Sequence, residues 1–281
     1  MYFPFTPLPC PEPIRVDHDP YAPVFTRPLP IPPWGPGTGD MIVVPAVGRP
    51  GRNDEIPPEW LRGAEGGPSL LDRFLAGLPD SGPTSSLLII HLDRPGVAEF
   101  LHGRLAAYGT AAELVALSRP TRGEAETVRL GLGAIGAPVE APLTVLGAEA
   151  LADLCHLPPV PGADGWLECG ENGRPFRGFV QGDAVGRLEE LSEQRGLSRL
   201  CGTGLYRLRS VALFRQVLNR LERRGGQDLS MAALFRQMLA EGHDLRYATA
   251  PARLAGVRPV PSVMPPPAVP RRLGLMAGLA G

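Results

Sequence analysis

The segment Met41–Asn53 reads MIVVPAVGRPGRN and joins an apolar run to a loop with glycines and arginines. Gly48 would allow the backbone to come close to a bound anion. The guanidinium groups of Arg49 and Arg52 carry forked N–H donors that fit phosphate oxygens. These residue types at this spacing suit a polyphosphate site. An ordinary surface turn with solvated arginines has the same composition, so the surrounding elements must decide between the two.

The basic residues narrow the chemistry that such a loop can support. Lysine is absent from the 281 residues, so all 28 basic side chains are arginines. This excludes a P-loop lysine and a Schiff-base lysine. Anion binding must therefore come from arginine side chains and backbone N–H groups.

Other kinds of site have no motif in this sequence. The four cysteines form no C-x-x-C pair, and the five histidines form no H-E-x-x-H pattern. We therefore expect neither a zinc site nor a disulfide framework. The net charge of −1 gives no overall attraction to nucleic acid. No apolar run reaches the roughly 18 residues of a membrane span, and the N-terminus does not resemble a secretory signal. The expected location is the cytoplasm.

Strand and helix patterns alternate through the first half of the chain, which indicates a parallel sheet with helices on both faces. Ligands of such sheets bind beyond the carboxyl ends of the strands, where the opening loop lies. The expected strands are 41–46, 85–92, 112–118 and 142–147, and the expected helices are 68–78, 95–109, 123–136 and 148–157.

The pattern changes after residue 164. The sequence predicts a hairpin over 165–180 around a GENG turn, a polar helix over 183–196 and a strand over 202–210. Two helices follow, with Ser210 and Ser230 in N-cap positions. A closing strand is expected after them, in the region of ATAPARLAGVRPV.

Both ends of the chain are rich in proline, which favours extended arms. Twelve of the 34 prolines fall within Pro4–Pro36, and six lie within Pro259–Pro270. We expect an N-terminal arm over 1–38, an α/β domain over 39–257 and a C-terminal tail over 258–281. The aromatic residues of the first arm suggest that it packs along the body of the protein, a second subunit or a protein partner.

The order of these segments resembles the sugar-nucleotide nucleotidyltransferases, a family with a GT-A-like Rossmann fold. IVVPAVGRPGRN is similar to the family's N-terminal signature, with Gly48 and Arg52 on its first glycine and its arginine. RPTRGEAETVRLGL is similar to its Thr-x-Gly-x-Ala-x-Thr stretch, and PLTVLGAEALAD to the strand before its metal-binding Asp. GTGLYRLRSVALF and MLAEGHDLRYA resemble later segments, so the resemblance spans roughly 40–250.

This resemblance implies a three-layer α/β/α fold with a mainly parallel, mixed sheet. It also implies transfer of a nucleotidyl group from an NTP to a sugar phosphate, in the synthesis of surface-polysaccharide precursors. Arg52 would act in catalysis, Glu149 would hold Mg²⁺, and the nucleotide would be bound by Gly48, Arg49, Arg52, Gly123, Glu124 and Thr127.

Four departures from the family pattern leave alternatives open. Pro50 replaces the second glycine and removes an N–H donor. Arg62 is the only cation near the place of the family's first lysine, and FVQGD replaces its later Glu-Lys. Glu149 replaces the metal-binding Asp. The chain could therefore be a catalytically degenerate binding or regulatory module whose arms contact a partner, or an unrelated α/β protein.

Overall fold

The computed structural model describes residues 14–16, 39–47, 69–77, 86–147, 150, 162–170, 178–192 and 198–249. Three predicted segments lie outside these residues: the loop after residue 47, the helix at 148–157 except residue 150, and the N-terminal arm except 14–16. The whole C-terminal tail over 258–281 lies outside them as well. The predicted domain boundaries therefore stay predictions.

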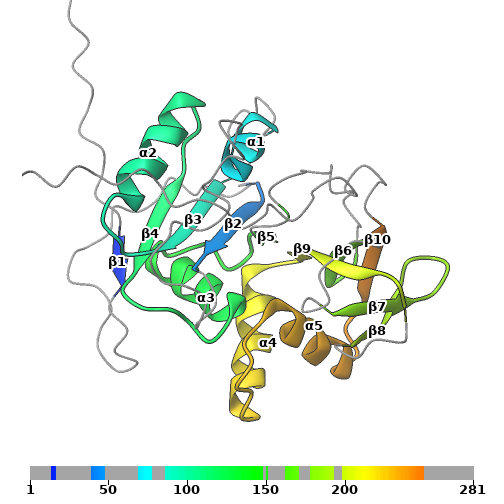
Figure 1. Ribbon diagram of the computed structural model, residues 1–281. Coiled ribbons are helices and arrows are strands. Elements are labelled where there is room, and N and C mark those ends of the chain that lie inside the picture. Colours follow the sequence, from blue (N-terminus) through cyan, green and yellow to red (C-terminus); the bar gives the residue numbers. More distant parts are fainter. Residues whose placement is uncertain are drawn as a thin grey trace, which may run out of the picture.

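A ten-stranded mixed sheet forms the centre of the protein, and eight of its strands follow the order β1-β4-β3-β2-β5-β9-β6-β10 (Figure 1). Pairing is parallel from β1 through β5, whereas β9 is antiparallel to both β5 and β6, and β10 is parallel to β6. The strands are β1 (Ile14–Val16), β2 (Met41–Ala46), β3 (Ser86–Leu92), β4 (Glu113–Leu117), β5 (Leu143–Leu146), β6 (Gly165–Gly170), β7 (Phe179–Gly182), β8 (Leu188–Ser192), β9 (Cys201–Leu208) and β10 (Leu245–Thr249).

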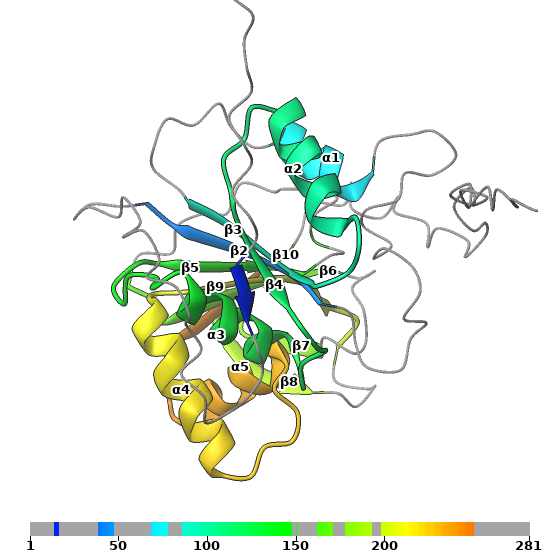
Figure 2. The same cartoon turned by 90° about the vertical axis from the view of Figure 1, so that its left-hand side faces the viewer.

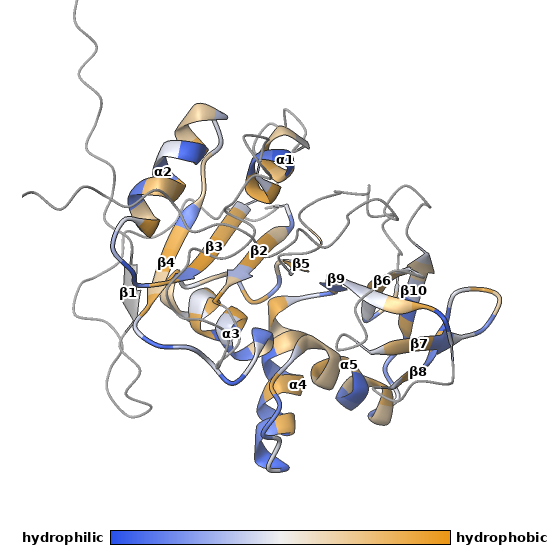
Figure 3. Cartoon of the chain, viewed as in Figure 1, coloured by the Kyte–Doolittle hydropathy of each residue, from blue (hydrophilic) through white to orange (hydrophobic). Residues whose placement is uncertain are grey.

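Helices cover both faces of this sheet, which confirms the predicted three-layer α/β/α architecture (Figure 2). Helices α1 (Leu70–Gly77) and α2 (Val97–Ala107) lie on one face, and α3 (Glu124–Ala134), α4 (Val211–Arg223) and α5 (Met231–Ala240) lie on the other. The parallel strands are apolar along most of their length (Figure 3). Successive residues of a strand point to opposite faces, so they divide between two buried clusters, one under each helical layer.

The two predicted serine N-caps are confirmed. Ser210 Oγ accepts a hydrogen bond from Leu213 N at 3.1 Å, and Ser230 Oγ accepts one from Ala233 N at 3.1 Å. Each bond satisfies a backbone donor that the first turn of a helix would leave unpaired. These caps fix where α4 and α5 begin, and therefore where both helices lie on the sheet.

Two predictions for the second half are wrong. Residues 188–192 form strand β8, not a helix, and pair with β7. Leu188 and Leu191 are both buried although they lie three residues apart, because a register shift at Gln181/Gly182 inserts one extra residue on β8. Two buried leucines at i and i+3 are also what one face of a helix would show, which is why the sequence predicted a helix here. The predicted hairpin between 165 and 180 is also wrong, since β6 pairs with β9 and β10, and β7 with β8 and β9.

Short segments lie at both edges of the sheet. Ile14–Val16, from the predicted N-terminal arm, pair with Val115–Leu117 of β4 in parallel. At the opposite edge, the turn between β7 and β8 contacts β10: Tyr247 N donates to Gly186 O at 2.8 Å, and Arg187 forms a bridge with Arg246. At least this part of the N-terminal arm therefore packs on its own chain.

A histidine is buried near the carboxyl end of β3. His91 is 1% exposed, and its Nδ1 donates to Leu92 O at 2.8 Å. Burial lowers the pKa of His91 below 6.5, and the nearby His102 acts in the same direction, while the hydrogen bond to Leu92 and the charges of Asp93 and Glu99 partly oppose it. The neutral ring leaves Nε2 as an acceptor, and it has no hydrogen-bond partner among the described residues. Protonation in the folded state would place a charge in an apolar layer.

This burial predicts a loss of stability in mild acid. Below pH 6.5 the unfolded chain binds a proton on His91 that the folded chain does not, so the free energy of unfolding falls as pH is lowered. The slope from one such group is at most about 1.4 kcal/mol per pH unit. Denaturant unfolding of the wild type and of His91→Leu between pH 7.5 and 5.5 measures it. The variant should be less pH-sensitive than the wild type, and equal slopes would contradict the prediction.

Candidate functional site at the carboxyl edge of the sheet

The carboxyl ends of four neighbouring parallel strands reach one edge of the sheet. The register pairs Leu92 of β3 with Leu117 of β4, Ala46 of β2 with His91 of β3, and Val43 of β2 with Val145 of β5. The segments that follow β2, β3, β4 and β5 therefore leave the sheet on the same side, which we call the carboxyl edge. This is the place where open α/β sheets bind ligands.

Two groups of predicted site residues follow directly from this edge. Gly48, Arg49 and Arg52 come after Val47, and Glu149 comes two residues after Gly147. All four lie outside the described residues, so their roles stay predictions. The backbone before Glu149 is fixed, because Gly147 N donates to Gly204 O of β9 at 2.8 Å.

The other predicted residues lie at the start of α3. The β4–α3 loop (residues 118–123) is stabilised by a pair of threonines: the Thr121 and Thr127 hydroxyls are 2.6 Å apart, and Thr121 Oγ1 also donates to Gly123 O at 3.1 Å. Thr127 is 2% exposed. The structure thus gives its hydroxyl a role in shaping the loop, and its contact with a nucleotide stays a prediction.

Gly123 allows two backbones to pass close to each other. A Cβ at this position would lie 2.4 Å from both the carbonyl carbon and the carbonyl oxygen of Leu229, and 2.7 Å from Ser230 N. Ala125 N donates to the same carbonyl, Leu229 O, at 2.9 Å. The glycine of the Thr-x-Gly-x-Ala stretch is therefore needed to join the start of α3 to the segment before α5. Glu124, the first residue of α3, is half-buried beside it.

Arginine and glutamate side chains surround this loop. Arg122 N donates to Glu126 Oε2 at 2.6 Å, and Arg122 Nη2 binds Glu126 Oε1 at 2.8 Å and Glu222 Oε1 of α4 at 2.7 Å. Hydrogen bonds with Glu126 raise the pKa of Arg122. Burial opposes ionisation of Glu126, but the hydrogen bonds from Arg122 outweigh it and lower the pKa of this carboxyl. Both groups are thus charged at neutral pH.

Another buried carboxylate, besides Glu126, belongs to β6, which lies next to β9 on the side away from β5. Glu168, near the carboxyl end of β6, is 4% exposed, and Thr203 Oγ1 of β9 donates to its Oε2 at 2.8 Å. Sequence reasoning missed this pair. The signal was present, because a single acidic residue inside the apolar run GWLECG requires a buried hydrogen-bond partner.

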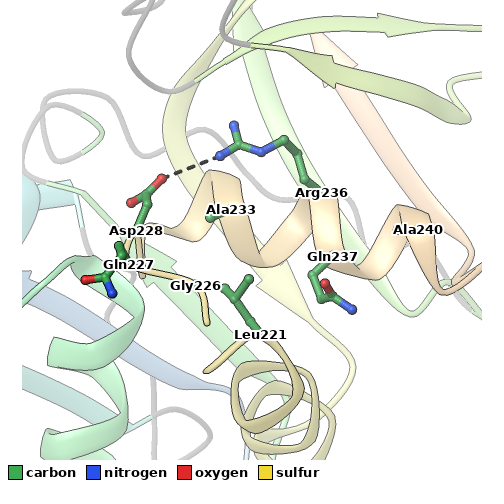
Figure 4. Close-up of a pocket in the computed structure, with 8 residues that line it drawn as sticks. All are labelled: Leu221, Gly226, Gln227, Asp228, Ala233, Arg236, Gln237 and Ala240. Atoms are coloured by element: carbon green, nitrogen blue, oxygen red, sulfur yellow. Dashed lines mark hydrogen bonds and ion pairs between the residues drawn. The ribbon is translucent and has the colours of Figure 1, made fainter. Parts of the chain in front are cut away.

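A hollow between α4 and α5 is separate from these residues (Figure 4). It has a volume of about 350 Å³ and is lined by Leu221, Gly226, Gln227, Asp228, Ala233, Arg236, Gln237 and Ala240. An ion pair of 3.5 Å between Arg236 and Asp228 lies beside it. It contains none of the residues that sequence analysis assigned to a nucleotide, so it is not the predicted site.

The described residues do not form a metal-binding site. Within the ranges given above, no three His, Cys, Asp or Glu side chains are grouped to hold an ion. The predicted magnesium ligand Glu149 falls in the gap between residues 147 and 150. A membrane-crossing helix is likewise not found in the described part of the chain.

Comparison with known proteins identifies the fold. A search of protein-family models and of curated proteins gives no match for the sequence. Among solved structures, the chain is similar to a nucleoside-diphosphate-sugar pyrophosphorylase from Vibrio cholerae RC9, with a TM-score of 0.62 and 23% identity over 76% of this chain and 93% of that one. It is also similar to the inositol-1-phosphate CTP transferase from T. maritima, with a TM-score of 0.53 and 13% identity over 76% of this chain and 86% of that one. The predicted nucleotidyltransferase-type fold is confirmed.

The close approach at Gly123 gives a matched pair of substitutions. Gly123→Ala should lower the free energy of unfolding by about 1–3 kcal/mol, because its methyl group meets backbone that cannot move aside. Gly133→Ala, in the last turn of α3, has no atom within 4 Å of the added Cβ. It should raise stability by about 0.5–1 kcal/mol through helix propensity. Denaturant unfolding of the two variants measures both changes, and a neutral Gly123→Ala would contradict the packing described.

Proposed function

We propose that this chain transfers a nucleotidyl group from an NTP to a sugar phosphate or a similar phosphate. The observation that carries the proposal is the shared fold over 93% of a nucleoside-diphosphate-sugar pyrophosphorylase, with the Thr-x-Gly-x-Ala-x-Thr stretch placed at the start of α3 on the carboxyl edge. We further propose a role in supplying precursors of surface polysaccharides, in the cytoplasm, where NTPs are available.

The reaction requires little covalent chemistry from the protein. An oxygen of the acceptor phosphate attacks the α-phosphorus of the NTP and forms a new P–O bond. The bond from the α-phosphorus to the bridging oxygen breaks, and pyrophosphate leaves with that electron pair. Catalysis of such a step rests on alignment of the two phosphates and on neutralisation of their charge.

Each predicted residue has a place in this scheme. The backbone at Gly48 and the guanidinium groups of Arg49 and Arg52 would hold the triphosphate, with Arg52 on the leaving phosphates. The start of α3, from Gly123 through Glu124 to Thr127, would adjoin the base. Mg²⁺, if bound, would neutralise phosphate charge, and the Glu149 carboxylate would hold it; the described residues group no further ligands for it.

Binding and turnover together test this function. Titration calorimetry with each of the four NTPs, with Mg²⁺ and with EDTA, should find one preferred nucleotide. Pyrophosphate release should then appear with a sugar-1-phosphate. Arg52→Ala should weaken NTP binding by at least about tenfold, since a charged hydrogen bond to phosphate is worth roughly 1.5–3 kcal/mol. Arg187→Ala, an exposed arginine in the β7–β8 turn, is the control and should bind normally.

The outcomes separate the alternatives. NTP binding with no pyrophosphate release for any of the sugar phosphates would indicate the catalytically degenerate module. No NTP binding would remove the proposed function altogether. NTP binding that is unchanged in Arg52→Ala would leave the function standing and would remove only the assignment of the loop after β2.

A further inference from the structure

Four charged side chains form a closed network between the β4–α3 loop and the end of α4. Its members alternate in sign and are Arg122, Glu126, Arg129 and Glu222. Arg122 belongs to the loop, Glu126 and Arg129 to α3, and Glu222 to α4. The network is neutral overall, and each side chain contacts two of opposite charge.

Glu222 joins the network across a large distance in the sequence. Its Oε1 accepts from Arg122 Nη2 at 2.7 Å, and its Oε2 binds Arg129 Nη1. The two arginines are 100 and 93 residues away from it. The Glu222 side chain is 24% exposed and the Arg122 side chain 49% exposed, so solvent screens part of the attraction between them.

The guanidinium group of Arg122 binds two carboxylates within this network. Its Nε donates to Glu126 Oε1 at 3.0 Å, and its Nη2 is shared between Glu126 and Glu222. Its backbone N–H is also bound to Glu126. A guanidinium held between two carboxylates is already neutralised, so Arg122 is suited to fixing the loop rather than to binding a phosphate.

The contact with Glu222 differs in kind from the contact with Glu126. The pair Arg122–Glu126 is local, with i,i+4 spacing, and joins Arg122 only to the first turn of α3. The contact with Glu222 joins the loop to a different helix, whose position is set by the Ser210 cap and by a buried apolar face. Without Glu222, the side chain of Arg122 would keep only its local partner in the network.

We infer that Glu222 and Arg122 are positioning residues, which hold the β4–α3 loop in the conformation that accepts the nucleotide. This inference rests on the proposed function, because it assigns the loop to the nucleotide. Neither side chain takes part in the chemical step. Their contribution is to reduce the conformational freedom that the loop would otherwise lose when the nucleotide binds.

A matched pair of variants tests this role. Glu222→Gln removes the charge that holds Arg122. Glu241→Gln removes a similar ion pair from the same helix, because Glu241 Oε2 binds Arg220 Nη1 of α4 at 2.7 Å and joins α4 to the end of α5. Both variants are compared with the wild type by hydrogen exchange at the amides of 118–123, and by KM for the NTP and kcat.

Glu222→Gln should speed exchange in the loop and raise KM for the NTP roughly three- to tenfold, with kcat changed by less than about twofold. Glu241→Gln should leave both the loop exchange and KM at wild-type values. Glu222→Asp, which keeps the charge, should recover part of the NTP affinity. If Glu222→Gln does not fold, as judged by circular dichroism, Arg122→Gln, which removes the same contact from its other partner, replaces it in the same assays.

Two failures can be told apart. If the wild type binds NTP and Glu222→Gln matches Glu241→Gln in KM and in loop exchange, the positioning role is overturned and the proposed function stands. If the wild type binds no NTP, the proposed function fails, and the nucleotide role of the network fails with it. KM values that rise equally in both glutamate variants would also overturn the positioning role and leave the proposed function standing, since a general loss of stability would then explain them.

Discussion

Parallel hydrogen bonding between β4, β3, β2 and β5 is the constraint on which the rest of this structure depends. Parallel neighbours cannot be joined by a tight turn, so each connection must cross the sheet, and α1, α2 and α3 lie within these crossings. The crossings bury both faces of the strands, which explains why β3 reads SLLIIHL almost without alternation. They also bring every carboxyl end to the same edge, so residues far apart in the sequence start from neighbouring positions.

Much of this fold could be predicted from local patterns. Apolar runs bounded by turn residues predicted strands β2 to β5, and the serines before α4 and α5 predicted where those helices begin. The failures occur where tertiary pairing overrides local spacing. Leu188 and Leu191 share the core through a bulge, and no local signal distinguishes that bulge from a helical turn. The GENG turn suggested a hairpin between β6 and β7, but β9, which comes later in the chain, pairs with both.

The candidate site shows the same division. The contact between Thr121 and Thr127 is readable from the Thr-x-Gly-x-Ala-x-Thr spacing because the two residues are only six positions apart. The need for glycine at 123 is not readable in this way, because Gly123 packs against Leu229, which comes much later in the chain. The ion pair between Arg122 and Glu222 could not be predicted from the sequence, because the two residues are 100 positions apart and Arg122 has a local partner, Glu126, at helical spacing. Glu168 was readable as a buried acid, although its partner Thr203 was not.

Short segments of the same chain lie against the outermost strands on both sides of the sheet, β4 and β10. Strand β1 contributes only three residues beside β4, and Pro13, which directly precedes it in the sequence, has no N–H to offer. On the opposite side of the sheet, Tyr247 N of β10 donates a hydrogen bond to Gly186 O in the β7–β8 turn. A long, unpaired strand recruits strands from other molecules. Among the described residues, the sheet therefore offers only short stretches of free strand against which another molecule could pair.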